Sequence, residues 1–148
     1  MKSCRFAPVL LLFGVICPLS GQQPASYQKK AAAALQFEVD QIGKDCPDAK
    51  TTLEQNSCMA GVEQKATADF QAFYESLRSL LGPNSEAVKQ LDSSQAQWEK
   101  YSKQACDAID TFYRDGSIRI SAVMGCQIQL RRSRMQDLDV LYNTTLHL

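Results

Sequence analysis

The sequence predicts an all-α protein, a disulfide-braced antiparallel bundle of three main helices. Apolar residues recur at steps of three and four along two long segments, as they do in amphipathic helices. No useful length of chain alternates apolar and polar residues as a strand does. Four cysteines follow the N-terminal leader, an even number that favours two disulfides in an oxidising compartment.

The first residues have the organisation of a signal peptide. Lys2 and Arg5 provide positive charge, and the uncharged run over residues 6–19 is shorter than the roughly 20 apolar residues of a membrane-spanning helix. Cleavage after Ser20 or Gly21 would make residues 1–21 the signal peptide. Lipoprotein anchoring through Cys17 is disfavoured, because the preceding residue is isoleucine where a small residue is expected.

The charge balance argues against two classes of partner. The chain has 16 basic and 16 acidic residues, so loss of Lys2 and Arg5 with the leader leaves only a slight acidic excess. No basic run is interleaved with aromatic residues. We therefore expect neither a nucleic acid nor an anionic membrane surface as the partner.

The cysteines beyond the leader are Cys46, Cys58, Cys106 and Cys126. Their spacings, 11, 47 and 19 intervening residues, do not fit the close ligand pairs of a structural zinc site. Cys58 and Cys106 lie 25 and 23 residues from Pro83, so antiparallel helices would bring them to one level. This favours the pairs Cys58–Cys106 and Cys46–Cys126, although four cysteines allow three pairings.

Turn signals divide the chain into helical segments. Residues 22–44 form an N-terminal extension, either a short alanine-rich helix ended by Gly43 or a frayed terminus. A long helix is predicted over about residues 51–81, with Gly82 as its C-cap and Asn84 or Ser85 capping the next. Its apolar stripe consists of Cys58, Val62, Ala66, Phe70, Phe73, Leu77 and Leu80 or Leu81.

The next helix is predicted over about residues 86–113. Its stripe consists of Val88, Leu91, Gln95, Trp98, Ser102, Ala105, Ile109 and Phe112. A buried Gln95 needs partners for its amide, so we expect it to bridge to a neighbouring helix. Ser117, in the following turn, can cap a last helix that runs from Ile118 to about Tyr142, before a mobile tail at 143–148.

The sequence contains few residues suited to catalysis. The single histidine, His147, lies in the tail, and the cysteines are better used as bridges. We therefore expect no enzyme activity, no cofactor and no metal site. The aromatic residues are interpreted mainly as packing, and the run Arg131, Arg132 and Arg134 as a solvated helix face.

A set of spaced residues resembles a known family, the lysozyme-inhibitor LprI-like N-terminal domain. The resemblance covers about residues 45–142, and its most specific part is Gln95-x-x-Trp98 together with the spaced cysteines. Its other motif residues include Asp69, Tyr74, Gly116, Ser117, Leu130 and Arg134. Asp115 before Gly116, and Arg131 where a threonine is common, depart from the pattern.

The resemblance implies an all-helical, secreted or periplasmic domain, with lysozyme inhibition as the activity known for a namesake member. An inhibitor of a basic enzyme gains association rate from an acidic surface, and Asp107, Asp110 and Asp115 are the local candidates, with an ordinary solvated surface as the alternative. The leading hypothesis is an exported, non-catalytic binding protein that inhibits lysozyme by steric occlusion. The alternative is a structural or envelope-interaction module that binds peptidoglycan or another exported protein.

Overall fold

Four long helices and one short helix run through residues 24–147, the part of the chain that the computed structural model describes. They are α1 (Pro24–Asp40), α2 (Thr52–Leu81), α3 (Glu86–Phe112), α4 (Arg119–Leu141) and α5 (Asn143–Leu146). This part contains no strand, which confirms the all-α prediction. The predicted signal peptide, its cleavage site and Cys17 lie outside the described residues.

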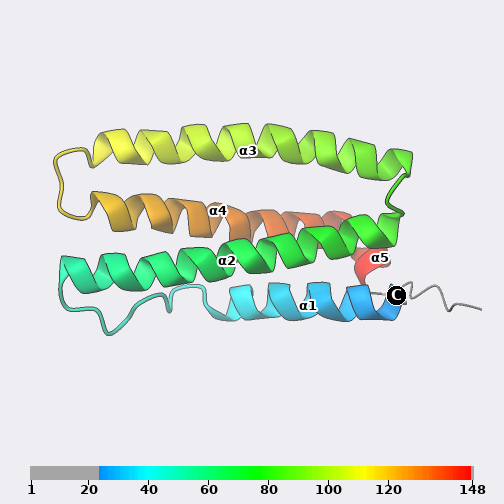
Figure 1. Ribbon diagram of the computed structural model, residues 1–148, viewed down its shortest axis with the longest axis horizontal. Coiled ribbons are helices and arrows are strands. Elements are labelled where there is room, and N and C mark those ends of the chain that lie inside the picture. The colour runs from blue at the N-terminus through cyan, green and yellow to red at the C-terminus, as the bar shows by residue number, and fades with distance from the viewer. Residues whose placement is uncertain (1–23, 148) are drawn as a thin grey trace, which may run out of the picture.

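The four long helices are arranged side by side, but not in chain order (Figure 1). Helix α4 packs closely against both α2 and α3, whereas α2 and α3 are further apart and meet through side chains such as Phe70 and Trp98. Helix α1 packs along the opposite side of α2, running antiparallel to it. The lateral order of the bundle is therefore α1, α2, α4, α3.

The predicted helix boundaries follow the capping residues closely. Thr51 and Glu54 form a capping box at the start of α2, each side chain accepting a hydrogen bond from the other's backbone N–H. Gly82 ends α2 with a φ of 88°, a conformation that glycine adopts without a steric penalty. Ser85 caps α3 by accepting a hydrogen bond from the Val88 N–H at 3.1 Å. These caps stabilise the helix ends by about 1 kcal/mol each.

The predicted cap of the last helix is wrong. Ser117 makes no capping hydrogen bond, and α4 begins one residue after Ile118, which is its N-cap residue. The reason lies in the turn, where the N–H of Gly116 donates to Tyr113 O at 2.8 Å and the N–H of Arg119 donates to Gly116 O. This places Ser117 inside the turn instead of at the helix start.

The main core draws side chains from all five helices. It contains Ala31, Ala34, Phe70, Phe73, Leu77, Leu91, Met135, Leu138 and Leu146. The stripe predicted for residues 51–81 is confirmed from Ala66 to Leu77, and burial of each large side chain contributes about 1.5–3 kcal/mol. Because Ala31 and Ala34 are buried in this core, the N-terminal extension is a packed helix of 17 residues and not a frayed terminus.

The C-terminal residues also belong to the bundle, so the prediction of a mobile tail is wrong for residues 143–147. Leu146 in α5 is only 3% exposed and packs in the main core. The Gln28 amide nitrogen donates a hydrogen bond to the Thr145 carbonyl oxygen at 3.0 Å, which ties α5 to α1. The buried Leu146, the Gln28–Thr145 hydrogen bond and the hydrogen bond between His147 and Asp139 together dock this segment on the bundle.

The two disulfides join Cys46 to Cys58 and Cys106 to Cys126, so the favoured pairing was wrong. Equal levels of Cys58 and Cys106 would favour a bridge only if α2 and α3, which are adjacent in sequence, were also adjacent in space. Helix α4 lies between them, and Cys106 therefore meets Cys126 across the α3–α4 connection. Cys58 is bridged instead by Cys46, which lies in the loop before α2 and has a positive φ of 56°. Each bridge contributes about 2–4 kcal/mol.

Candidate functional site

Helix α4 holds the bundle together through three arginines, which reach α1, the loop before α2, α2 and α3. Arg132 donates from Nε to Glu38 of α1 at 2.8 Å and from both terminal nitrogens to Asp45. The guanidinium of Arg131 lies 3.0 Å from a carboxylate oxygen of Glu63 on α2. The interpretation of this run as a solvated face is wrong, because Arg132 is 2% exposed and Arg134 9%.

Arg134 connects α4 to α3 through Gln95. Arg134 Nε donates to Gln95 Oε1 at 3.3 Å, and its terminal nitrogen donates to Ser94 Oγ at 2.9 Å. Gln95 is 5% exposed and donates its own amide proton to Glu99. The prediction that Gln95 bridges to a neighbouring helix is therefore confirmed.

Other residues of the predicted motif secure α2 against α3. Trp98 stacks on Phe70, with ring centroids 5.6 Å apart, and Phe70 also stacks on Tyr74. The Tyr74 hydroxyl donates to Asp92 at 2.9 Å, and burial together with this carboxylate raises the pKa of Tyr74. These aromatics pack between helices, as expected, and Trp98 remains partly exposed at their edge.

The remaining motif residues lie apart from this contact. Asp69 pairs with Lys65 on α2, one turn away. Leu130 is half-buried on α4 and lines a shallow hollow against α3 with Ile109 and Tyr113. Gly116 and Ser117 are exposed in the α3–α4 turn. The motif as a whole is therefore distributed along the bundle and does not converge on one site.

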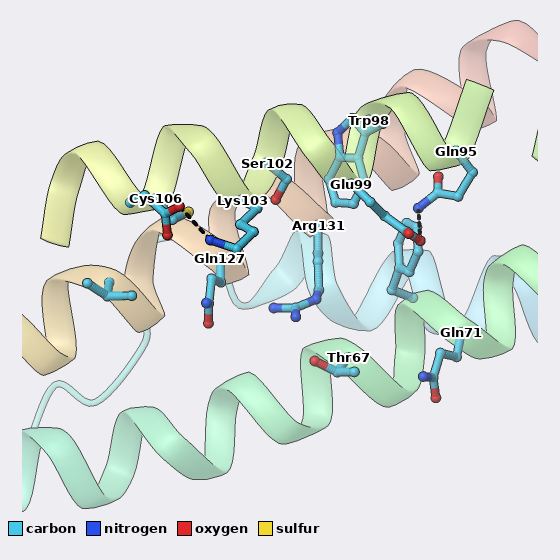
Figure 2. A pocket seen from close by; sticks show the side chains of 13 residues that line it. Thr67, Gln71, Gln95, Trp98, Glu99, Ser102, Lys103, Cys106, Gln127 and Arg131 are labelled. Atoms are coloured by element: carbon cyan, nitrogen blue, oxygen red, sulfur yellow. Dashed lines mark hydrogen bonds and ion pairs between the residues drawn. The ribbon is translucent and has the colours of Figure 1, made fainter. Parts of the chain in front are cut away.

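A groove opens between α2 and α3 and is floored by α4 (Figure 2). Its volume is about 370 Å³, which lies in the range of small-ligand sites. The lining side chains come from three helices, including Thr67 and Gln71 of α2, Trp98 and Ser102 of α3, and Gln127 and Arg131 of α4. The groove exists because α2 and α3 separate away from their connection while α4 supports both.

The acidic candidates lie at the end of the bundle where α3 turns into α4. Asp107 pairs with Lys103 at 2.6 Å, and Asp110 accepts two hydrogen bonds from Arg119 at 2.7 Å. The Arg119 guanidinium holds the pKa of Asp110 below its usual range. Asp107 and Asp110 are therefore paired within the chain. Of the three acidic candidates, Asp115 is the one without an ion pair among the described residues.

The same end carries exposed apolar side chains. We define residues 112–120, which connect α3 to α4, as the tip. Phe112 is 79% exposed, Ile118 50% and Ile120 59%, so the prediction that Phe112 belongs to the buried stripe is wrong. The buried stripe of α3 ends at Cys106, and the last turn of the helix exposes Phe112. The Cys106–Cys126 bridge fastens the base of the tip.

Comparison with known proteins settles the family. A family model described as "Lysozyme inhibitor LprI" matches residues 44–138, about two thirds of the chain. The chain belongs to the LprI lysozyme-inhibitor family. The LprI match takes in both disulfides, the groove and the tip, and it leaves out α1 and α5. No curated protein and no solved structure matches the chain.

The sequence reasoning missed the buried Glu38–Arg132 pair, although the signal for it was present. Glu38 continues the helical spacing of Ala31 and Ala34 on the buried face of α1. Arg132 likewise stands between Ile128 and Met135 on the buried face of α4. A single charge on each of two apolar stripes indicates a buried ion pair, because an unpaired charge there would be too costly.

No helix within residues 24–147 combines the length and apolar character that crossing a bilayer requires.

Proposed function

We propose that this protein is an exported, non-catalytic inhibitor of lysozyme that acts by steric occlusion. The LprI family match carries the proposal, because the family is described by that activity and the match covers the whole central bundle. Inhibitors of this kind bind an enzyme and perform no chemistry of their own, which agrees with the lack of catalytic residue patterns in the sequence.

Export to the periplasm or the medium is part of the proposal. Two disulfides are typical of proteins that fold in an oxidising compartment. The leader over residues 1–21, with two basic residues before an uncharged run, supports the same route.

The tip is the surface that we assign to the enzyme. Its exposed Phe112, Ile118 and Ile120 give an apolar contact surface at one end of the bundle, and exposed apolar patches of this kind mark protein interaction sites. Fastening of the tip by the Cys106–Cys126 bridge lowers the entropy lost on binding. An apolar surface held in this way could cover the enzyme's cleft and close it to the polymeric substrate.

Long-range electrostatic attraction contributes little to the proposed binding. Asp107 and Asp110 are neutralised by Lys103 and Arg119, so the tip offers little long-range attraction to a basic enzyme. We therefore expect association with lysozyme to be only weakly dependent on ionic strength. The binding energy would come mainly from the apolar side chains of the tip.

The test is a titration of animal-type lysozyme with the oxidised, exported protein, reading cell-wall lysis and direct binding in parallel. The proposal predicts saturable inhibition at a protein concentration that matches the binding isotherm, at roughly micromolar affinity or tighter. Helical circular dichroism verifies that the protein is folded. A folded protein that neither binds nor inhibits at high micromolar concentration would refute the proposal.

A further inference from the structure

The groove between α2 and α3 has hydrogen-bonding groups that nothing in the described chain uses. The side chains of Gln71, Ser102 and Gln127 line it from α2, α3 and α4 respectively, and they have no side-chain partner among residues 24–147. In Figure 2, the side chains of Ser102 and Gln127 project into the space between the helices. A side-chain amide provides both donors and acceptors, and a hydroxyl provides one donor and two acceptor sites.

Both cations that line the groove are paired. Lys103 is paired with Asp107, and Arg131 lies against Glu63. Glu99 accepts a hydrogen bond from Gln95 and has no paired cation among residues 24–147. The lining therefore has no excess positive charge to recognise a phosphate or a carboxylate, which argues against an anionic ligand.

An aromatic surface adjoins these polar groups. Trp98 lines the groove and is only partly buried, and its ring is held in place by the stack on Phe70. Tryptophan offers a large rigid face to apolar C–H groups, and its position is fixed here before any ligand arrives. An aromatic face beside unoccupied amides and hydroxyls is suited to a sugar ring, which has apolar C–H faces and hydroxyls around its edge.

We propose that this groove binds a short stretch of an uncharged, N-acetylated glycan chain. The acetamido groups of such a glycan match the amide donors and acceptor of Gln127 and the hydroxyl of Ser102, and its ring faces match Trp98. The volume of about 370 Å³ suits a few sugar units and not a folded protein. This binding site is separate from the tip and does not depend on lysozyme inhibition.

The position of Trp98 provides a direct readout, because it is the chain's single tryptophan. The full chain, expressed with its own leader and purified in its oxidised form, is titrated with the uncharged trisaccharide N,N′,N″-triacetylchitotriose, called chitotriose below. We expect a saturable change in Trp98 fluorescence, and a matching isotherm by calorimetry. Because no lysozyme is present, a negative result in this titration counts only against glycan binding. The proposed inhibition of lysozyme is tested separately.

Two substitutions locate the binding. Gln127→Ala removes hydrogen bonds to the ligand, and Ser102→Leu fills the groove from α3, so each should weaken chitotriose binding by about tenfold. Gln104→Ala and Ser93→Leu, at exposed positions of α3 outside the groove lining, should leave the affinity within about twofold. Thermal unfolding of all four variants verifies their fold.

Three results would overturn the assignment. The first is no fluorescence change and no heat at roughly 10 mM chitotriose, where even a millimolar complex would be mostly formed. The second is binding that both groove variants leave unchanged. The third is saturation of the Trp98 signal by a Gly-Ser-Asn peptide with acetylated and amidated termini, with no response to the trisaccharide, which would make the groove a peptide site.

Discussion

Arg132 of α4 and Glu38 of α1 form an ion pair in the interior, with Nε and Oε2 2.8 Å apart and both side chains 2% exposed. Asp45, just ahead of α2, completes the arrangement by accepting two further hydrogen bonds from Arg132. One guanidinium thus satisfies two carboxylates from segments 94 and 87 residues away in sequence. This contact docks α1, which lies outside the LprI match, onto the family's central bundle.

Removal of this guanidinium should strongly destabilise the protein. Arg132→Met leaves Glu38 and Asp45 without their cation, so we expect a loss of about 3–5 kcal/mol in the free energy of unfolding, measured by urea denaturation. Lys89→Met is the control, because Lys89 forms an exposed pair with Glu86 and such pairs contribute about 0–1 kcal/mol. Equal effects of the two substitutions would contradict the buried network.

Glu38 should also give the stability a specific pH dependence. Burial raises the pKa of Glu38, against the lowering effect of Arg132, and nearby Asp69 raises it further. The folded state then holds the Glu38 proton more tightly than the unfolded chain does. The contribution of this group is therefore present below its unfolded pKa of about 4.3 and is lost as the pH rises through the folded pKa.

Glu38→Gln isolates this effect, because glutamine keeps an oxygen for Arg132 and cannot ionise. We expect the stability of Glu38→Gln relative to the unsubstituted protein to increase as the pH is raised from about 4 to 7. Urea denaturation across this range measures the difference. If Glu38→Gln instead gained stability relative to the unsubstituted protein as the pH is lowered, the pKa of Glu38 would be lowered in the fold.

The docked C-terminus makes a simpler prediction. Leu146→Ala should cost about 2–4 kcal/mol, because Leu146 is buried against the main core and its removal leaves a cavity. Leu53→Ala is the matched control, since Leu53 is 79% exposed, and it should change the unfolding free energy by less than about 0.5 kcal/mol. Similar small effects at both positions would show that α5 is not docked.

The disulfide connectivity can be measured directly. Proteolysis of the oxidised protein without reduction should release linked peptides containing Cys46 with Cys58 and Cys106 with Cys126. Double replacement of Cys106 and Cys126 by serine should cost about 2–4 kcal/mol. Recovery of a peptide that joins Cys58 to Cys106 would contradict the lateral order of the helices.

The helix boundaries could be predicted from local sequence, whereas the lateral order of the helices in the bundle could not. Thr51, Gly82 and Ser85 mark helix ends through short-range hydrogen bonds and backbone conformation, which adjacent residues determine. The level of Cys58 along the bundle follows from helical rise, but its neighbour depends on which helix packs beside α2, and periodicity does not specify that. The groove was missed for the same reason.

The candidate site was predictable in part. Gln95 was identified as a bridging residue because a polar side chain interrupts an apolar stripe, and Arg134 is the partner that the structure provides. The sequence predicts an acidic patch because Asp107, Asp110 and Asp115 occur in one segment, but Arg119, nine residues after Asp110, pairs with it across the turn. Charge counts along a segment omit such folded contacts.

Contact between the tip and lysozyme is tested by calorimetric titration of lysozyme with a tip variant. Phe112→Ser combined with Ile120→Ser removes two exposed apolar side chains and should weaken binding more than about tenfold, with loss of inhibition in parallel. Leu53→Ser, an equally exposed position on α2, should bind as the unsubstituted protein does. Unchanged binding by the folded tip variant would contradict the account.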